Sequence, residues 1–418
     1  MAGARTRPRW RRALAICVLA AVVAPGPTTP AVGEPSLTPA NCTAFATTPS
    51  FRTDHTALCF TYTGATSLLM SVDGGHSYSS YPVVVTPSRN PQTVVRRVVF
   101  SPQYAQDKTV YLLTQDGIFS GGLTPVAGVG FTFTAVDLLA NRSGAVPAVA
   151  PFVDATTSGL AFASAEVQTS RRITPPAGST FVTGTQPAAS TIAFVIPPRF
   201  GPGDPAIALG AGPPERLYSC NAALTCLTLL AEFPTNAKAL FASPQFATDH
   251  AFFLDIAIKS RGHLLERSTD SGNTWTPWPG LMRALSAWNA PKHYLSPTYG
   301  IAWDPSNSKR IYAQASMARD VPGGTEGRLM ILRSDNGGVS FKQVAYATPG
   351  TNRPGTYHGT AWNYPGGLGP DSLALHVATD GTVFAHGKDL LPGSYDYTGW
   401  FCSIDRGVHW AKVCPKRY

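Results

Sequence analysis

Ser268-Thr-Asp270-Ser-Gly272-Asn-Thr-Trp275 is one of four copies of an eight-residue pattern, and this pattern decides the fold of the chain. Written as a rule, the pattern is Ser-x-Asp/Asn-x-Gly-x-x-aromatic. The other copies are Ser71-Val-Asp73-Gly-Gly75-His-Ser-Tyr78, Ser334-Asp-Asn336-Gly-Gly338-Val-Ser-Phe341 and Ser403-Ile-Asp405-Arg-Gly407-Val-His-Trp410. Because self-similarity marks repeat architectures, the same local structure is expected at each copy.

The residue types of the pattern describe a tight turn between two strands. Short polar side chains at the Ser and Asp positions can hydrogen-bond to backbone N–H groups of the turn. Glycine adopts the positive φ that other residues resist. The closing aromatic ring is expected to tuck under the turn, where its burial contributes about 2–3 kcal/mol. These residues stabilise a β-hairpin, and none of them is a catalytic requirement.

A second phrase also repeats and allows the units to be counted. Its clear copies are Thr48-Pro-Ser-Phe51-Arg-Thr-Asp54, Ser101-Pro-Gln-Tyr104-Ala-Gln-Asp107 and Ser243-Pro-Gln-Phe246-Ala-Thr-Asp249. Each copy leads into an apolar run, which indicates a strand, a turn with Asp, and a strand. With weaker copies included, seven units begin near residues 48, 98, 146, 191, 240, 296 and 370.

The eight-residue pattern resembles the Asp-box, or BNR, repeat of sialidases, sortilin-type receptors and many secreted β-propellers. The resemblance implies an all-β chain that forms a single β-propeller of four-stranded antiparallel blades. Seven units predict seven blades, and six blades are the alternative if the segment 146–190 is a long insertion. Box residues in such propellers sit at the outer rim, so a structural role is expected for them here. An N-terminal strand is expected to pair with the final blade.

Residues 1–33 have the features of a secretory signal peptide. Five arginines precede an apolar run over residues 13–23, which is too short for a membrane span, and small and Pro-rich residues follow. The propeller domain is then 34–418, and we expect it to be secreted, monomeric and without a membrane span. This domain has 28 basic and 24 acidic residues, a net charge of +4. Because no basic stripe is evident, no nucleic-acid partner is expected.

Six cysteines remain after residue 33, and an even number in an exported chain favours disulfides over zinc. Proximity in the sequence pairs Cys42 with Cys59, Cys220 with Cys226, and Cys402 with Cys414. In the fourth unit Cys220 and Cys226 replace part of the box and could close its hairpin. His55 and His250 follow repeat-equivalent aspartates and are interpreted as turn positions. The chain has no CxxC, His-Glu-x-x-His or EF-hand pattern, so no metal and no cofactor are expected.

A sialidase is the enzymatic alternative that the resemblance suggests. Sialidases use a tyrosine nucleophile primed by a glutamate, an aspartate acid/base and three arginines, an exception to the usual pair of carboxylates. Their Arg-Ile-Pro motif is missing here, because the nearest string, Arg171-Arg-Ile-Thr-Pro175, contains an inserted Thr. Catalytic residues are unknown from the sequence. It favours a non-catalytic protein, and a divergent sialidase or other glycoside hydrolase stays open.

Two aromatic-rich segments without repeat character are the candidate binding site. They contribute Trp288, Tyr294, Tyr357, Trp362 and Tyr364. Extra residues between units usually form loops, and aromatic faces with nearby amides suit sugar or peptide binding. The alternative is that these rings pack over the propeller's own face. The sequence thus predicts a secreted module that recognises a glycan or protein through one face, with a structural or assembly propeller as a further alternative.

Overall fold

The structure is a computed structural model of the whole chain, and the part described here has several gaps. The described residues are 42–87, 93–101, 103–114, 116–138, 148–153, 158–164, 169–173, 182–185, 191–195, 206–210, 214–221, 225–233, 237–243, 245–258, 262–286, 293–321, 324–346, 375–388 and 398–416.

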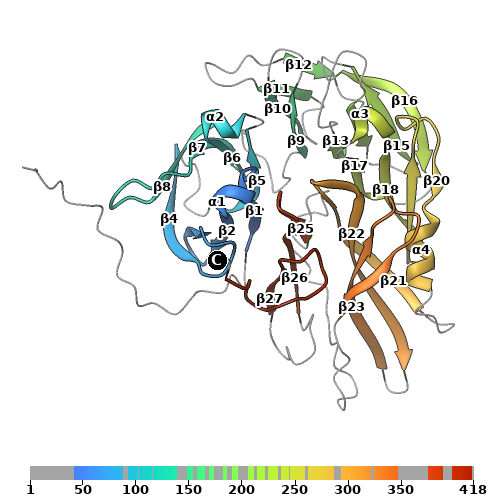
Figure 1. Cartoon of the computed structure of the whole chain (residues 1–418). Coiled ribbons are helices and arrows are strands. Elements are labelled where there is room, and N and C mark those ends of the chain that lie inside the picture. Colours follow the sequence, from blue (N-terminus) through green and yellow to red (C-terminus); the bar gives the residue numbers. More distant parts are fainter. Residues whose placement is uncertain are drawn as a thin grey trace, which may run out of the picture. The chain divides into compact units, whose positions relative to one another are not determined.

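The described strands form seven antiparallel sets in chain order, six of four strands and a last one of three, and we name the sets units 1 to 7 (Figure 1). Unit 1 contains β1 Ala44–Thr47, β2 Ala57–Tyr62, β3 Thr66–Ser71 and β4 Ser79–Thr86, and unit 2 contains β5 Val95–Phe100, β6 Thr109–Thr114, β7 Gly117–Gly122 and β8 Phe131–Leu138. Unit 3 contains β9 Ala148–Val153, β10 Ser158–Ser164, β11 Thr169–Ile173 and β12 Val182–Thr185, and unit 4 contains β13 Thr191–Val195, β14 Ala206–Gly210, β15 Glu215–Cys220 and β16 Cys226–Phe233.

Units 5 to 7 follow the same order. Unit 5 contains β17 Ala237–Ala242, β18 Phe252–Ile258, β19 Gly262–Ser268 and β20 Thr276–Pro277, and unit 6 contains β21 His293–Asp304, β22 Asn307–Val321, β23 Gly324–Ser334 and β24 Lys342–Tyr346. Unit 7 contains β25 Leu375–Val377, β26 Val383–Lys388 and β27 Thr398–Ser403, and an isolated bridge from Cys402 to Ala411 lies where a fourth strand would pair.

Each unit begins within five residues of the start that the sequence repeats predict. Within the segment 146–190, treated as an insertion in the six-blade alternative, strands β9 to β12 form the four-stranded sheet of unit 3. That every unit is one blade of a seven-bladed ring stays a prediction.

The first two units are joined along their outer strands, which the sequence did not predict. β4 pairs with β8 in parallel, with Val83 opposite Phe131, and this pairing merges eight strands into one sheet. A side chain at Gly130 could not be accommodated there, because a Cβ would lie 2.2 Å from the Pro82 carbonyl oxygen. Since an unpaired edge strand leaves backbone N–H and C=O groups exposed, the pairing removes two open edges.

Hydrophobic clusters fill the spaces between neighbouring units. Pairs of buried residues from these clusters are Phe60 and Phe133 for units 1 and 2, Leu209 and Phe252 for units 4 and 5, Phe253 and Leu332 for units 5 and 6, Tyr312 and Phe401 for units 6 and 7, and Phe45 and Phe384 for units 1 and 7. Strands covered on both faces explain continuous apolar runs such as Val110–Leu113. Antiparallel units of four strands, three in the last, follow one another along the chain, and the last packs against the first, so this chain is an all-β propeller.

The described strands of unit 7 all come from the C-terminal end of the chain. The N-terminal strand that we expected to pair with the final unit is therefore not among them. In the described part, units 7 and 1 meet instead through side chains, including the rings of Phe45 and Trp400, which stack with centroids 4.0 Å apart.

The second repeated phrase folds into a single helical turn between the first two strands of a unit. The three turns are α1 Phe51–Asp54, α2 Tyr104–Asp107 and α3 Phe246–Asp249. In the first, Asp54 Oδ1 accepts hydrogen bonds from Thr48 Oγ1 at 2.6 Å and from the Thr56 N–H at 2.9 Å. His55 ends this turn in the left-handed region, as Lys108 and His250 do in the others. The prediction of a turn built on Asp is confirmed, and its helical form is new.

The longest described helix is α4, Pro279–Ser286. Among the described residues, no helix combines the length and the apolar character that crossing a membrane requires.

Candidate functional site: the face of the box turns

The predicted aromatic binding residues fall largely outside the described part of the chain. Trp288, Tyr357, Trp362 and Tyr364 all lie there. Tyr294 is in β21, where its backbone pairs with Ala318, and its side chain is not described. The aromatic site therefore stays a prediction. The four copies of the eight-residue pattern are described with their hydrogen bonds and ion pairs, so they are taken as the candidate site.

The copy at residues 268–275 forms a closed set of hydrogen bonds within eight residues, and we call each copy a box turn. Ser268 Oγ donates to Asp270 Oδ1 at 2.8 Å and accepts from the Gly272 N–H at 2.8 Å. Asp270 Oδ1 accepts from the Thr274 N–H at 2.9 Å, and Asp270 Oδ2 from Thr274 Oγ1 at 2.6 Å. All of these partners are local, so the sequence alone specifies the turn.

The other three box turns repeat this arrangement. The glycine N–H donates to the serine Oγ over 2.8 Å in turn 71–78, 2.9 Å in turn 334–341 and 2.7 Å in turn 403–410. The side chain at the seventh position, which the sequence rule leaves variable, is hydrogen-bonded in every copy to the Asp or Asn side chain at the third position. The residues there are Ser77, Thr274, Ser340 and His409. The recurrence of polar residues at this position was the signal that could have revealed their role.

These hydrogen bonds occupy the acidic side chains of the box turns. Burial acts to raise the pKa of Asp270, but hydrogen bonds from Thr274 and Ser268 outweigh it and lower the pKa below the ordinary value. The pKa values of Asp73 and Asp405 are lowered in the same way, with burial opposed by bonds from Ser77 and His409. The three carboxylates are thus ionised, and each accepts hydrogen bonds from residues of its own turn.

Each box turn packs closely against the preceding unit of the ring, and the absence of a side chain on its glycine permits this close approach. Gly338 has φ +86°, and a Cβ on it would lie 2.2 Å from the Trp278 ring that precedes α4. Gly75 has φ +91°, and a Cβ there would lie 2.9 Å from Cys414 Sγ in the last unit. The glycine thus serves both the turn conformation and the contact between units.

The closing aromatic rings are held by their own turn and also reach the preceding unit. Trp275 Nε1 donates to the Gly272 carbonyl at 2.9 Å, and the Trp275 ring meets Phe233 of unit 4 edge-on at 5.9 Å. The prediction that the ring tucks under its turn is correct, but its burial is incomplete. All four rings, Tyr78, Trp275, Phe341 and Trp410, are only partly buried, because the turns lie at the molecular surface.

Three box turns form a continuous series, which we call the box arc: 334–341 in unit 6, 403–410 in unit 7 and 71–78 in unit 1. Arg333 Nη1 donates to the Arg406 carbonyl at 2.5 Å and links the first two. His76 Nδ1 lies 2.8 Å from the Cys414 carbonyl and links the last two. Box turn 268–275 in unit 5 lies outside the arc.

The box arc exposes apolar side chains at its tips. Val72 and Val339 are each 64% exposed, Val408 is 58% exposed and Ile404 38%. These are half of the exposed large hydrophobic residues in the described part of the chain. In box turn 268–275 the corresponding positions hold the polar residues Thr269 and Asn273. In the arc, four of the six positions of this kind are apolar and the other two are His76 and Asp335.

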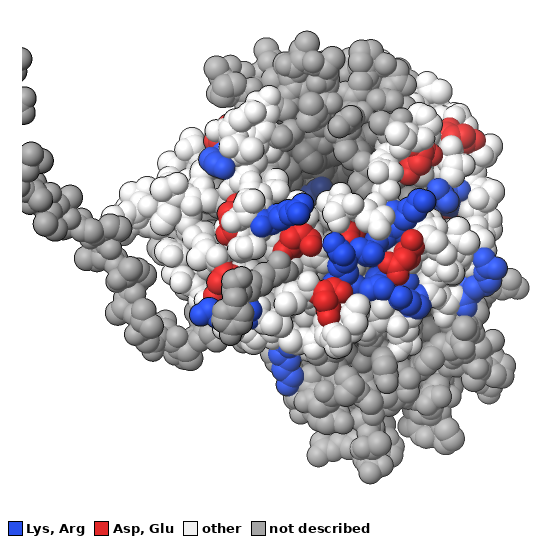
Figure 2. All heavy atoms as spheres, viewed as in Figure 1, with Lys and Arg blue, Asp and Glu red and all other residues white. Residues whose placement is uncertain are grey.

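A network of ion pairs is centred on Asp335, in box turn 334–341 at one end of the box arc. Asp335 accepts from Arg310 Nε at 2.8 Å and from Arg333 Nη2 at 3.0 Å, and Lys342 Nζ lies 3.4 Å away. Arg310 also pairs with the fully buried Asp304 at 3.0 Å. Burial acts to raise the pKa of Asp335, but the two arginines outweigh it and lower the pKa. Figure 2 shows basic and acidic side chains interleaved on this face.

Two predicted disulfides are confirmed, Cys42–Cys59 and Cys402–Cys414. Cys220 is disulfide-bonded as well, and its partner in the strand register of unit 4 is Cys226. Among the described residues, no group of three His, Cys, Asp or Glu side chains could hold a metal ion.

Glu266 is the described carboxyl group whose environment disfavours its charge, because burial raises its pKa. It lies on β19, the third strand of unit 5, with Leu254 and Pro277 as backbone partners. Glu266 precedes a box turn in the sequence, two residues before Ser268.

Comparisons with known proteins give similarity at the level of three-dimensional structure. No known family and no curated protein matches the chain by sequence. YCF48 from Cyanidioschyzon merolae is 11% identical, with 85% of this chain and 95% of that chain covered and a TM-score of 0.48. Chaetomium thermophilum Sqt1, bound to the N-terminus of ribosomal protein L10, is 13% identical, with coverages of 80% and 79% and a TM-score of 0.46. Virginiamycin B lyase from Staphylococcus aureus is 11% identical, with coverages of 77% and 89% and a TM-score of 0.43. None of these similarities assigns a ligand to this chain. The protein is therefore classified by its own fold alone, as a β-propeller.

Proposed function

We propose that this chain is an exported, non-catalytic, seven-bladed Asp-box propeller that binds a protein partner through the box arc. The observation that carries the proposal is the exposure of Val72, Val339, Ile404 and Val408 on three neighbouring box turns. Isolated exposed apolar residues are ordinary, whereas apolar residues grouped within a polar surround are typical of interaction sites.

The charges around the apolar tips favour a partner that offers acidic as well as apolar side chains. Arg406 and Lys309 are exposed, and Lys342 is 61% exposed although its Nζ lies 3.4 Å from Asp335. The acidic side chains nearby are already engaged, Asp335 by two arginines and Asp405 by His409. Arg406 and Lys309 are thus the exposed basic groups that can face a partner, and complementary charge would speed its association.

Export is supported by two kinds of observation. The disulfides Cys42–Cys59 and Cys402–Cys414 are typical of oxidising compartments. Residues 1–33 have the charge and length pattern of a signal peptide. The propeller would then meet its partner outside the compartment in which it is made.

The experiment that tests the proposal compares a position in the arc with its counterpart outside it. A photo-crosslinking amino acid is placed at Val408 or at Asn273, and the protein is irradiated in the medium of the cells that export it. We expect one protein adduct from position 408 and none from 273. In a binding titration with that protein, Val339→Asp with Val408→Asp should weaken affinity at least tenfold, and Thr269→Asp should not.

Three results would overturn the proposal. Unchanged affinity of the Val339→Asp/Val408→Asp variant for that protein would show that the box arc is not part of the interface. Glycan-array binding that is lost on Trp288→Ala or Trp362→Ala would establish the glycan alternative. Hydrolysis of a fluorogenic sialoside or another glycoside, abolished by a single Glu, Asp or Tyr substitution, would establish an enzyme.

A further inference from the structure

The contact between unit 7 and unit 1 differs from the other contacts between units, and we call it the seam. It consists of Cys42, Phe45, Phe51, Ala57 and Cys59 from unit 1 and Ala378, Phe384, Trp400, Cys402 and Cys414 from unit 7. Four of these ten buried residues are disulfide-bonded cysteines. The clusters between units 1 and 2, 4 and 5, 5 and 6, and 6 and 7 contain no cysteine among their described residues.

The disulfide in unit 1 contacts unit 7 directly. Cys42–Cys59 ties the segment before β1 to β2, and Trp400 Nε1 of unit 7 donates to Cys42 Sγ at 2.9 Å. The same tryptophan stacks on Phe45, the second residue of β1. The position of the innermost strand of unit 1 therefore depends on a contact that includes a disulfide sulfur.

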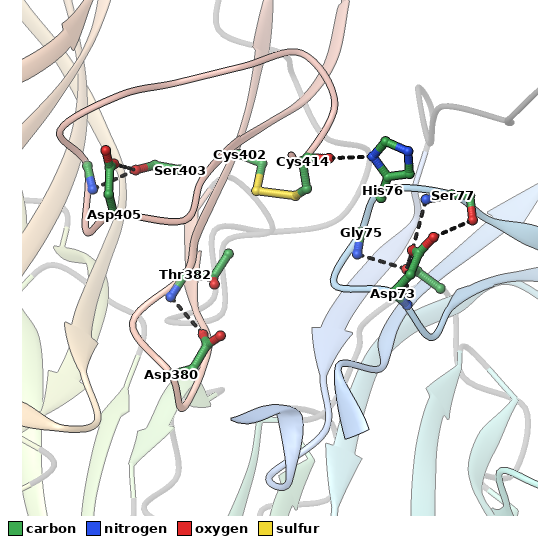
Figure 3. Close-up of a disulfide and its surroundings, with 12 residues drawn as sticks. Asp73, Gly75, His76, Ser77, Asp380, Thr382, Cys402, Ser403, Asp405 and Cys414 are labelled. Atoms are coloured by element: carbon green, nitrogen blue, oxygen red, sulfur yellow. Dashed lines mark hydrogen bonds between the residues drawn. A yellow bond between two sulfur atoms is a disulfide. The ribbon is translucent and has the colours of Figure 1, made fainter. Parts of the chain in front are cut away.

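The disulfide in unit 7 holds a whole box turn against unit 1. Cys402 and Cys414 flank the turn 403–410, so their bond closes a loop around it. Cys414 Sγ lies against Gly75, and the Cys414 carbonyl is bonded to His76 in the neighbouring box turn (Figure 3). In contrast, the glycines of box turns 268–275 and 334–341 face Ile207 and Trp278, neither of which is a cysteine.

The noncovalent contacts that the described residues make across the seam include ring contacts of Phe384 with Phe45 and Phe51, and hydrogen bonds. Thr47 Oγ1 lies 2.7 Å from His376 Nε2, and the Arg52 N–H donates to Thr379 Oγ1 at 3.3 Å. The described strands of the two units share no backbone ladder. By comparison, units 1 and 2 are joined by the β4–β8 pairing. Each disulfide lies within its own unit and does not cross the seam, so it acts by fixing residues that contact the other unit.

We propose that the seam is an oxidation-dependent lock of the ring, independent of the function proposed above. With both disulfides formed, units 7 and 1 stay closed. A dithiol reductant would give two electrons and two protons to each disulfide, yielding two protein thiols, and would itself become a cyclic disulfide. The reduced chain then opens at the seam while the remaining units stay folded. Because all four cysteines are at most 4% exposed, reduction itself requires a transient opening of the seam.

Hydrogen exchange on the full chain, followed by mass spectrometry, tests this proposal. The oxidised protein is compared with the protein in dithiothreitol and with two variants, Cys42→Ser/Cys59→Ser and Cys402→Ser/Cys414→Ser. We expect at least tenfold faster exchange over 44–78 and 375–416 in the reduced protein. Peptides covering 268–275 and 334–341 should change less than twofold. A matched control, Leu332→Ala in the cluster between units 5 and 6, should accelerate exchange in 334–341 in either redox state.

Two outcomes would overturn the lock. Equal acceleration in every unit would mean that the disulfides stabilise the whole domain and not the seam. Unchanged exchange at the seam after complete reduction, verified by counting thiols in denaturant, would mean that noncovalent packing suffices. If one double variant does not fold, the wild-type protein in dithiothreitol still gives the result. The readout needs no binding partner, so failure here leaves the function proposal untouched.

Discussion

Box turns 268–275 and 403–410 have nearly the same internal hydrogen bonds but different neighbours. In both, serine Oγ bonds the acidic side chain and the glycine N–H, and the tryptophan donates to the glycine carbonyl. The first has polar tips and rests on the aliphatic side chain of Ile207. The second has apolar tips and is enclosed by a disulfide. The comparison teaches that an eight-residue sequence encodes the turn, whereas the surroundings decide what the turn is used for.

The largest effect is expected where a box glycine meets a rigid neighbour. Gly338→Ala would place a Cβ 2.2 Å from the buried ring of Trp278 and force a left-handed conformation on alanine. We expect a loss of about 4 kcal/mol in the free energy of unfolding, measured by chemical denaturation. Gly272→Ala should cost about half of that, because its nearest neighbour is the mobile end of Ile207.

Gly337→Ala provides the control for Gly338→Ala. Gly337 also has a positive φ, +70°, but nothing lies within 4 Å of a Cβ there. A loss of only about 1 kcal/mol is expected from the conformation alone. Equal losses for Gly337→Ala and Gly338→Ala would show that contact with the preceding unit is unimportant.

The serine of the box turn should matter equally inside and outside the arc. Ser268 is 1% exposed and Ser403 is fully buried, and each holds a glycine N–H that would be left unpaired in the alanine variant. We expect Ser268→Ala and Ser403→Ala each to lower the free energy of unfolding by about 2–3 kcal/mol. A difference of more than about 1 kcal/mol between them would contradict the view that the turns are encoded locally.

Acidic pH should weaken the seam through His376. Burial lowers the pKa of His376 from 6.5 to about 4 in the folded state. Between these values the unfolded chain binds the proton more readily, so stability falls as the pH decreases from 6.5 to 4. Since His376 as a whole residue is only partly buried, we expect a loss of about 2 kcal/mol in the free energy of unfolding, somewhat less than the pKa shift alone implies.

Denaturation at pH 7 and pH 4.5 tests the role of His376. His376→Gln should remove most of the difference in the free energy of unfolding between pH 7 and pH 4.5 that His376 causes. His250→Gln, at an exposed turn, should leave this difference unchanged. If both variants keep the full wild-type difference, another group is responsible.

The smallest effect is expected at the tips of the box arc. Val339→Ser and Val408→Ser replace side chains that are 64% and 58% exposed, so the free energy of unfolding should change by less than about 0.5 kcal/mol. The same substitution at Thr269 should also be neutral. A cost of more than about 1 kcal/mol at Val408 would mean that the apolar tips serve the fold, and the binding role would lose its support.

Much of the fold could be predicted because its signals are repeated or short in range. The hydrogen bonds that the serine and the acidic or amide side chain make within a box turn join residues at most four positions apart, so one pattern is sufficient to identify it. The start of each unit was placed within five residues for the same reason. The candidate site was less accessible. The aromatic segments attracted attention by composition, whereas the tips of the box arc occupy positions that the pattern leaves variable.

The sequence by itself determined the turns, the units and the two confirmed disulfides, since each depends on residues close together in the chain. The tertiary structure alone decided that β4 pairs with β8, that three of the four box turns form an arc, and that the confirmed disulfides meet in one seam. These features join residues separated by up to 358 positions, as in the bond from Trp400 to Cys42. The physical reason is that local hydrogen bonds need only local partners, whereas contacts between units exist only once the last unit has packed against the first.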